Sequence, residues 1–370
     1  MKFSDIPSHA EAKEKLRQMI DSNHIPHALL IEGPEGIGKF ALARAAAQYL
    51  HCENRQNGDS CGKCPACIQH QAFNHIDTHF IFPVVNKDRI SDDYIGEWRE
   101  FLTESPYMDF RKWMTYLDSP NTQPAIYVKE SEDIIHKLSF TSHRSRYKVV
   151  LMWLPERMRI EAANKLLKQI EEPFSDTIFI LVSNHSNEIL PTIYSRTQRI
   201  VLRRLADSEI ASYLTGNYTV SDDDAMALSH LAEGSLLKAR ELITLNSENK
   251  KFLALFIELM RKAYQRDVKS LKTWAGDVAA LGREQEVRML TYCMRLIREN
   301  FIYNLHVASL NYLNQEEKAF SANFARFVNE RNVVQLMEEL NRASIDIAGN
   351  ANGKIVLFDL ALRVILLLKA

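Results

Sequence analysis

The sequence predicts an α/β module built on a parallel sheet, followed by an all-α region. Short apolar runs alternate with helical segments up to about residue 205, and no strand pattern follows. The apolar runs are continuous rather than alternating, which is typical of strands covered by helices on both faces. The first run is followed by a glycine-rich loop and then a helix, the order that a phosphate-binding loop requires.

The individual elements follow from periodicity and from Gly and Pro positions. Strands are predicted at 27–33, 78–84, 147–155, 177–184 and 199–205. Helices are predicted at 10–22, 40–50, 131–140 and 160–172. The segment 86–125 is rich in Asp, Pro and aromatic residues, and we expect a solvated surface excursion with some helix.

Three domains are predicted: 1–205 as the α/β module, 206–246 as a small helical unit and 247–370 as a larger helical domain. Net charge is -1, from 46 basic and 47 acidic residues, which gives no global sign of nucleic-acid binding. The N-terminus is polar, so no signal peptide is expected, and the apolar C-terminal stretch is too short and charged to span a bilayer. These features favour a cytoplasmic protein without a membrane partner.

The loop GPEGIGKF (33–40) offers backbone donors at Gly33, Gly36 and Gly38, and the positive charge of Lys39, to a phosphate group. A complete phosphate loop continues with Ser or Thr, whose hydroxyl holds Mg²⁺, but this chain has Phe40. The pattern leaves two interpretations open. The loop retains ATP or ADP without hydrolysing it, or it is a structural remnant with Phe40 packed into the vacant pocket.

A second magnesium contact is also missing. A P-loop ATPase carries acidic residues at the end of a neighbouring apolar strand. Here the strand at 147–155 ends in Trp153, Leu154 and Pro155. Loss of both contacts predicts that there is no Mg²⁺ site and that the chain does not hydrolyse ATP.

Four of the five cysteines are clustered as Cys52-x8-Cys61-x2-Cys64-x2-Cys67. Two-residue gaps allow successive thiolates to converge on one ion, and Gly62 permits the tight turn between them. Four thiolates leave no open coordination position, so the pattern predicts a structural Zn²⁺ in an insertion at 52–67. Free cysteines and an iron–sulfur cluster are the weaker alternatives.

Several residues near this cluster, and one distant cysteine, receive no role as ligands. His51, His70 and His75 are expected to be surface or loop residues. Cys293 lies in a helical stretch and is expected to be a small buried hydrophobic residue. The predicted metal site therefore consists of cysteines alone.

Five segments in order resemble the AAA+ clamp-loader subunits of bacterial DNA polymerase III. They are HALLIEGPEGIGK, the four-cysteine insertion, HIDTHFIFP, YKVVLMWLPERMRIEAANKLLKQIEEP and ILVSNHSNEILPTIYSRTQRI. The resemblance covers about residues 1–245 and, more loosely, the C-terminal helices. It implies an AAA+ P-loop module, a helical lid and a collar that builds a hetero-oligomer. Implied partners are gamma/tau and delta subunits and, through the complex, the sliding clamp and primer-template DNA.

The resemblance also assigns residues. Asn184 matches the polar residue, called the sensor, that the family carries at the end of this strand. Ser195, Arg196 and Thr197 match the family's Ser-Arg-Cys signature, with Thr in place of Cys. In the family, that arginine is presented to ATP held by a neighbouring subunit. A surface arginine or an internal ion pair are the alternatives for Arg196. The lid of the ATP-hydrolysing relatives carries the motif Gly-Ser-x-Arg-x-Ala. Gly234, Ser235 and Ala239 match it, but Leu237 stands where the relatives have Arg. This third departure further weakens the case for bound nucleotide.

The expected function is therefore that of a non-hydrolysing clamp-loader subunit, a part of the DNA polymerase III holoenzyme that itself lacks ATPase and polymerase activity. One alternative is the ATP-hydrolysing clamp-loader subunit, against which Phe40, Trp153 and Leu154 argue. The other is a zinc-ribbon nucleic-acid-binding protein, against which the balanced charge argues.

Overall fold

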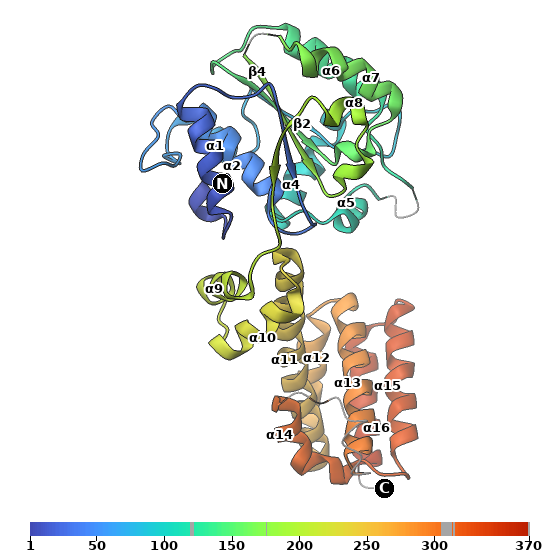
Figure 1. The fold of residues 1–370 in the computed structure, drawn as a ribbon. Helices are drawn as coiled ribbons and strands as arrows, with labels where there is room; N and C mark the ends of the chain where they lie inside the picture. Colours follow the sequence, from blue (N-terminus) through green and yellow to red (C-terminus); the bar gives the residue numbers. More distant parts are fainter. Residues whose placement is uncertain (119–121, 175, 305–312, 314, 369–370) are drawn as a thin grey trace. The chain divides into compact units, whose positions relative to one another are not determined.

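The computed structural model describes all residues except 119–121, 175, 305–312, 314 and 369–370. The chain forms two compact units, Met1–Leu242 and Ile243–Ala370 (Figure 1). Helix α11 (Leu236–Gln265) runs through this division and also through position 246, where the sequence predicts a domain boundary. Each unit is described by itself.

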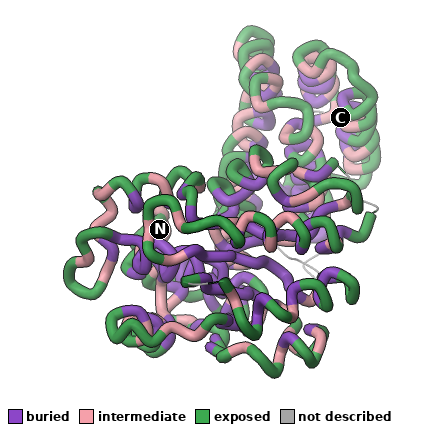
Figure 2. Tube along the Cα trace, turned by 90° about the horizontal axis from the view of Figure 1, so that it is seen from above, coloured by how far each residue is buried: buried purple, intermediate pink, exposed green. Residues whose placement is uncertain are grey.

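The first unit is built on a parallel sheet, as predicted. Its strands are β1 (Ala28–Glu32), β2 (Thr78–Ile81), β3 (Lys148–Trp153), β4 (Thr177–Ser183) and β5 (Gln198–Val201). The strand order is β2-β3-β4-β1-β5, and every neighbouring pair is parallel. The three central strands, β3, β4 and β1, are wholly buried, and Figure 2 shows buried residues gathered in the interior. The five predicted strands are confirmed, with ends that differ by a few residues.

Helices cover both faces of this sheet because successive side chains of a strand point to opposite sides. Val150 and Met152 of β3 belong to the core on the side of α6, α7 and α8. Helix α2 packs on β3 and β4 from the other side, where Trp153 contributes its ring. The four predicted helices are confirmed. The helices of this unit are α1 (Ala10–Asp21), α2 (Lys39–His51), α3 (Pro65–Gln71), α4 (Ile95–Glu104), α5 (Phe110–Tyr116), α6 (Val128–Ser139), α7 (Ile160–Glu171), α8 (Pro191–Tyr194), α9 (Asp207–Asn217), α10 (Asp222–Ala232) and the start of α11.

The expectation of a solvated excursion at 86–125 is wrong for its central part. The segment 91–117 forms a short 3-10 turn (Ser91–Tyr94) and helices α4 and α5. Trp98, Phe101 and Trp113 in this segment are fully buried. Their rings give the segment enough apolar surface to pack against the sheet instead of remaining in solvent. Residues 119–121 of the predicted excursion lie outside the described residues.

The second unit is all-α in its described residues, which agrees with the predicted fold class. Beyond α11 its helices are α12 (Val268–Ala279), α13 (Arg283–Asn304), α14 (Gln315–Phe324), α15 (Val333–Ala348) and α16 (Gly353–Leu367). Helix α13 packs on α15, and α16 packs on both α12 and α15 (Figure 1). Cys293 lies in their common core, as predicted. Among the described residues, no helix is long and apolar enough to cross a membrane.

Candidate functional site

The glycine loop lies between β1 and α2, where a phosphate loop is expected. Gly33, Gly36 and Gly38 all have positive φ angles, of 152°, 77° and 94°, which favour glycine. Gly36 is also needed for space, because a Cβ atom there would lie 2.3 Å from the Ser235 hydroxyl oxygen. The loop thus has the backbone of a phosphate loop, but Ser235 and Leu237, at the start of α11, pack directly onto it.

Lys39 is turned back onto its own loop. Its ammonium group donates to the carbonyl oxygen of Gly33 at 2.7 Å and also to that of Pro34. Burial lowers the pKa of Lys39 to about 8, and the carboxylates of Glu156 and Glu35 partly oppose this change. The carbonyl oxygens of the loop therefore satisfy the hydrogen bonds of the lysine.

Aromatic rings occupy the two positions at which magnesium contacts are missing. Phe40 is 2% exposed, and its ring centroid lies 5.7 Å from that of Trp98. Trp98 in turn lies 5.4 Å from Trp153. Phe101 and Phe110 of the same segment lie 5.8 and 6.2 Å from Trp153. The segment 91–117 therefore fills the side of the loop on which a Ser or Thr hydroxyl and an acidic pair would hold Mg²⁺.

Asn184 lies at the carboxyl end of β4, where the sensor is expected. Its backbone N–H donates to Glu156 Oε1 at 2.9 Å, and the next N–H, of His185, donates to the same oxygen at 3.2 Å. A cavity of about 330 Å³ opens here, lined by Asn184, by Glu156 and by Glu35 of the loop itself. Phe110 and Leu154 also line this cavity, so open space remains at the polar end of the sheet beside the rings that replace the magnesium contacts.

Arg196 follows α8 and is exposed. Its Nε donates to Glu171 Oε1 at 2.5 Å, and one of its terminal nitrogens donates to the Thr192 carbonyl at 2.8 Å. The pair is solvent-accessible, with 36% of the arginine side chain and 47% of the glutamate side chain exposed. Exposed ion pairs contribute only about 0–1 kcal/mol, so Arg196 can exchange Glu171 for another anionic partner at little cost.

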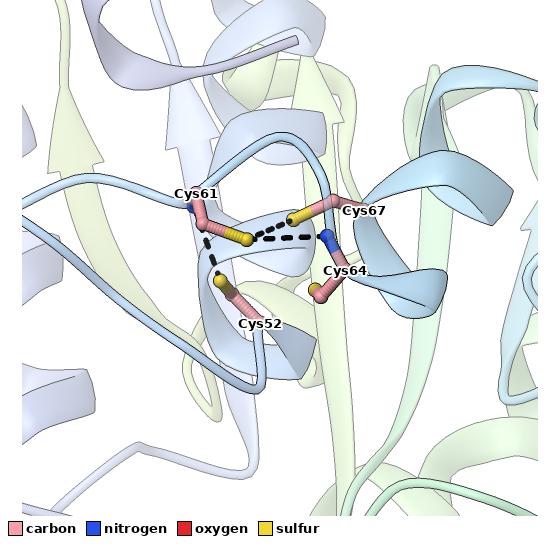
Figure 3. A group of neighbouring side chains, drawn as sticks. All are labelled: Cys52, Cys61, Cys64 and Cys67. Atoms are coloured by element: carbon pink, nitrogen blue, oxygen red, sulfur yellow. Dashed lines mark hydrogen bonds between the residues drawn. The ribbon is translucent and has the colours of Figure 1, made fainter.

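The four predicted cysteines converge (Figure 3). Cys52 ends α2, Cys64 begins α3, and Cys67 lies within α3. All four sulfur atoms lie within 4.8 Å of one another, and those of Cys61 and Cys67 are 3.9 Å apart. A tetrahedral ion with metal–sulfur bonds of about 2.3 Å requires sulfur atoms about 3.8 Å apart, so the cluster has the right size for such an ion.

Backbone donors favour thiolate in this cluster. The N–H groups of Lys63 and Cys64 point at Cys61 Sγ, at 3.4 and 3.3 Å. These bonds lower the pKa of Cys61 to about 6, whereas burial raises the pKa of Cys67. A φ of 71° at Gly62 permits the turn that brings these donors in, as predicted. The residues present therefore fit a metal ion held by four thiolates.

The expectation that the three histidines are surface or loop residues is wrong for their exposure, and only His75 lies outside the helices and strands. His51, His70 and His75 are buried and lie close together. His51 Nδ1 lies 2.8 Å from His70 Nε2, and its Nε2 lies 2.9 Å from the Tyr147 carbonyl oxygen. The rings of His51 and His75 are stacked with 13° between their planes. A ring nitrogen binds metal in the plane of its ring, so the stacked pair does not converge on one ion, and we interpret the group as a hydrogen-bonded core cluster.

Sequence reasoning missed several residues at these sites. The role of Glu171 depends on a helix end that meets Arg196 only in three dimensions. The burial of Trp98, Phe101 and Trp113 could have been suspected, because the stretch 94–116 is unusually aromatic for a solvated segment. Aromatic residues in a surface excursion must find a site of burial or remain a costly exposed patch.

A parallel sheet in this order, a phosphate-type loop after the first strand and a helical lid pressed on that loop define a P-loop module of the AAA+ class. A family model described as "DNA polymerase III, delta subunit" matches residues 8–206, more than half of the chain. The chain belongs to this family, that of the delta-prime clamp-loader subunits of DNA polymerase III.

Two relatives that are similar in sequence agree with this assignment. The DNA polymerase III subunit delta' of Pseudomonas aeruginosa is 32% identical over 46% of this chain and 41% of its own length. That of Escherichia coli is 24% identical over 95% of this chain and 92% of its own length. A solved gamma subunit-related protein of Thermotoga maritima is 15% identical, with 96% of this chain and 99% of that chain covered and a TM-score of 0.39.

Proposed function

We propose that this chain is a non-hydrolysing subunit of a clamp loader, which helps to load the sliding clamp onto primed DNA and offers Arg196 to ATP held by a neighbouring subunit. Its partners would be gamma/tau and delta subunits in the cytoplasm, with the clamp and primer-template DNA reached through the complex. The AAA+ module at 1–205, the lid at 206–246 and the collar at 247–370 would be its working parts.

The observation that carries this proposal is the aromatic filling of the magnesium side. Phe40 and Trp153 lie where a hydroxyl and a carboxylate would be needed, and both are buried against the same ring of Trp98. Without a metal ion to neutralise the transferring phosphate, this site cannot stabilise the transition state of hydrolysis. The positions Gly33, Gly36, Gly38, Lys39 and Asn184 are then a degenerate nucleotide site.

Two features support a role in trans for Arg196. Its guanidinium is exposed and held by a weak pair, so a neighbour's phosphates can compete for it. Glu171 sets its direction in the free chain and, by our proposal, is a positioning residue.

We propose a structural Zn²⁺ on Cys52, Cys61, Cys64 and Cys67, because four thiolates close the coordination shell.

The test is a reconstituted clamp loader that carries Arg196→Ala, assayed for DNA-stimulated ATP hydrolysis and clamp loading. We expect normal assembly, with hydrolysis reduced by on the order of 10³-fold at the one site that the chain abuts. Because other sites continue to turn over, the whole complex should lose much less activity than that site.

The matched control is Arg199→Ala, which removes an exposed neighbouring arginine that bonds the Tyr194 hydroxyl. It should assemble and hydrolyse ATP like the wild type. Glu171→Gln should change activity much less than Arg196→Ala, because the arginine remains. Wild-type hydrolysis and loading with Arg196→Ala would show that Arg196 has no role in trans.

A further inference from the structure

We propose that the segment 91–117 is a built-in occupant of the nucleotide position, and that its Tyr107 joins the phosphate loop to the lid so that the lid is held without nucleotide. This inference rests on one part of the proposed function, namely that the chain's own phosphate loop does not use ATP.

Tyr107 lies in the turn between α4 and α5 and reaches the glycine loop. Its ring carbons lie 3.6 and 3.7 Å from the position that a Cβ atom on Gly38 would take. Gly38 is the residue before the first turn of α2, the end of a helix at which phosphates bind in P-loop proteins. The phenol ring, which is 6% exposed, thus packs at the part of the loop that a nucleotide would use.

The same ring also contacts the lid. It meets the ring of Tyr213 in α9 edge to face, with centroids 5.8 Å apart. The guanidinium of Arg240, on α11, lies 5.7 Å from the Tyr107 ring centroid. Arg240 also donates to the Tyr218 hydroxyl at 3.0 Å, which connects α11 to the residue that follows α9. One side chain of the segment therefore touches the loop and two elements of the lid.

A second contact fixes the lid to the loop directly. The backbone N–H of Leu237 donates to the Gly36 carbonyl oxygen at 3.1 Å. The side chain of Leu237 is apolar, so at this point the lid meets the loop through a main-chain bond and offers no charged group.

The segment itself is anchored at both ends, to helix α6 and to the residues that follow β2. At its start, the Ser91 N–H donates to Glu130 Oε2 at 2.6 Å. Near its end, the indole N–H of Trp113 donates to the Pro83 carbonyl oxygen at 2.9 Å. Between these anchors, the ring of Trp98 stacks on that of Phe82 with centroids 4.0 Å apart. A nucleotide would have to displace buried rings, which resist exposure to water.

The experiment is hydrogen–deuterium exchange of the full zinc-loaded chain, read on peptides from α9 and α10. Tyr107→Ala should raise lid exchange at least about tenfold, because the opening free energy of a local unit sets its exchange rate. Peptides from β4 and α7, and the zinc content, should not change. Tyr107→Phe should retain most of the protection, because the ring makes the contacts with loop and lid.

Tyr94→Ala is the matched control, since this half-buried tyrosine of the same segment has its ring under the guanidinium of Arg89. It should leave lid exchange at the wild-type level. Tyr213→Ala, which changes the lid side of the contact, should reproduce the effect of Tyr107→Ala. Unchanged lid exchange in both of these variants would overturn the proposal while leaving the role of Arg196 in the complex intact.

A nucleotide titration completes the test. Mg-ATP or ADP should leave both lid exchange and the unfolding midpoint of the wild-type chain unchanged. A nucleotide present at a hundredfold excess over its Kd would raise that midpoint by roughly 5–10 °C. Such a rise in the wild type, with slower lid exchange, would show that the segment leaves the site open and would refute the proposal.

Discussion

Replacement of Trp98 by alanine tests the claim that the segment 91–117 belongs to the core. Trp98 is completely buried, and five aromatic rings lie with centroids within 6 Å of its own. We expect Trp98→Ala to lower the free energy of unfolding of the first unit by about 3–4 kcal/mol.

The magnitude follows from two opposing effects. A tryptophan buries about 200 Å² of surface, which at about 25 cal/mol per Å² corresponds to about 5 kcal/mol. The indole N–H has no hydrogen-bond partner among the described residues. Its removal therefore offsets about 1–2 kcal/mol of the lost free energy of unfolding. The result agrees with the roughly 3–5 kcal/mol measured for Trp→Ala in other cores.

The assay is urea unfolding of the zinc-loaded chain, followed by tryptophan fluorescence. Three of the four tryptophans, Trp98, Trp113 and Trp153, lie in the first unit, and two of them remain in the variant. Far-UV circular dichroism follows the helices of both units. On heating, the midpoint should fall by roughly 6–16 °C for a unit of this size.

Trp98→Phe is the control. It keeps an apolar ring in the cluster and removes the unpaired N–H, so we expect a loss below about 1.5 kcal/mol. A loss below about 1 kcal/mol for Trp98→Ala itself would refute the reasoning, because that is the behaviour of a side chain in a solvated excursion.

Three further predictions concern other sites. The purified chain should contain one zinc ion. Cys61→Ser should retain less than about a tenth of an equivalent after dialysis against a chelator, and its circular dichroism should show that the sheet is still folded. Wild-type protein that lacks zinc although its thiols are intact would contradict this. Burial raises the pKa of Glu130 to about 7 from an ordinary 4.5, so its contribution to stability is full below pH 4.5 and lost as pH rises through 7. Relative to Glu130→Gln, the wild type should therefore lose up to about 3 kcal/mol between pH 4.5 and pH 8 in urea unfolding, and parallel pH profiles would contradict this. Phe40→Thr should not turn over ATP in a phosphate-release assay, because Trp153 still supplies no acid; clear turnover would contradict this.

Local spacing in the sequence was enough for much of this protein. Continuous apolar runs between helices predicted the parallel sheet, because both faces of such strands are covered. The two-residue gaps at Cys61, Cys64 and Cys67 predicted the cluster, because the local geometry of a tight turn brings neighbouring ligands together without contacts from distant segments. The replacement of a hydroxyl and an acidic residue by Phe40 and Trp153 was also visible in the sequence, since it depends on residue identity alone.

What the tertiary structure alone decided was which distant segments meet. No local pattern showed that the stretch around Trp98 and Tyr107 packs between the loop, the sheet and the lid, because its burial depends on contacts with Phe40, Trp153 and Tyr213. The same holds for Glu171 beside Arg196, and for the three histidines, which come from the end of α2, from α3 and from the turn before β2. The sequence determines the chemical groups that a chain carries and their local geometry, whereas their burial and their partners arise only when packing brings remote segments together.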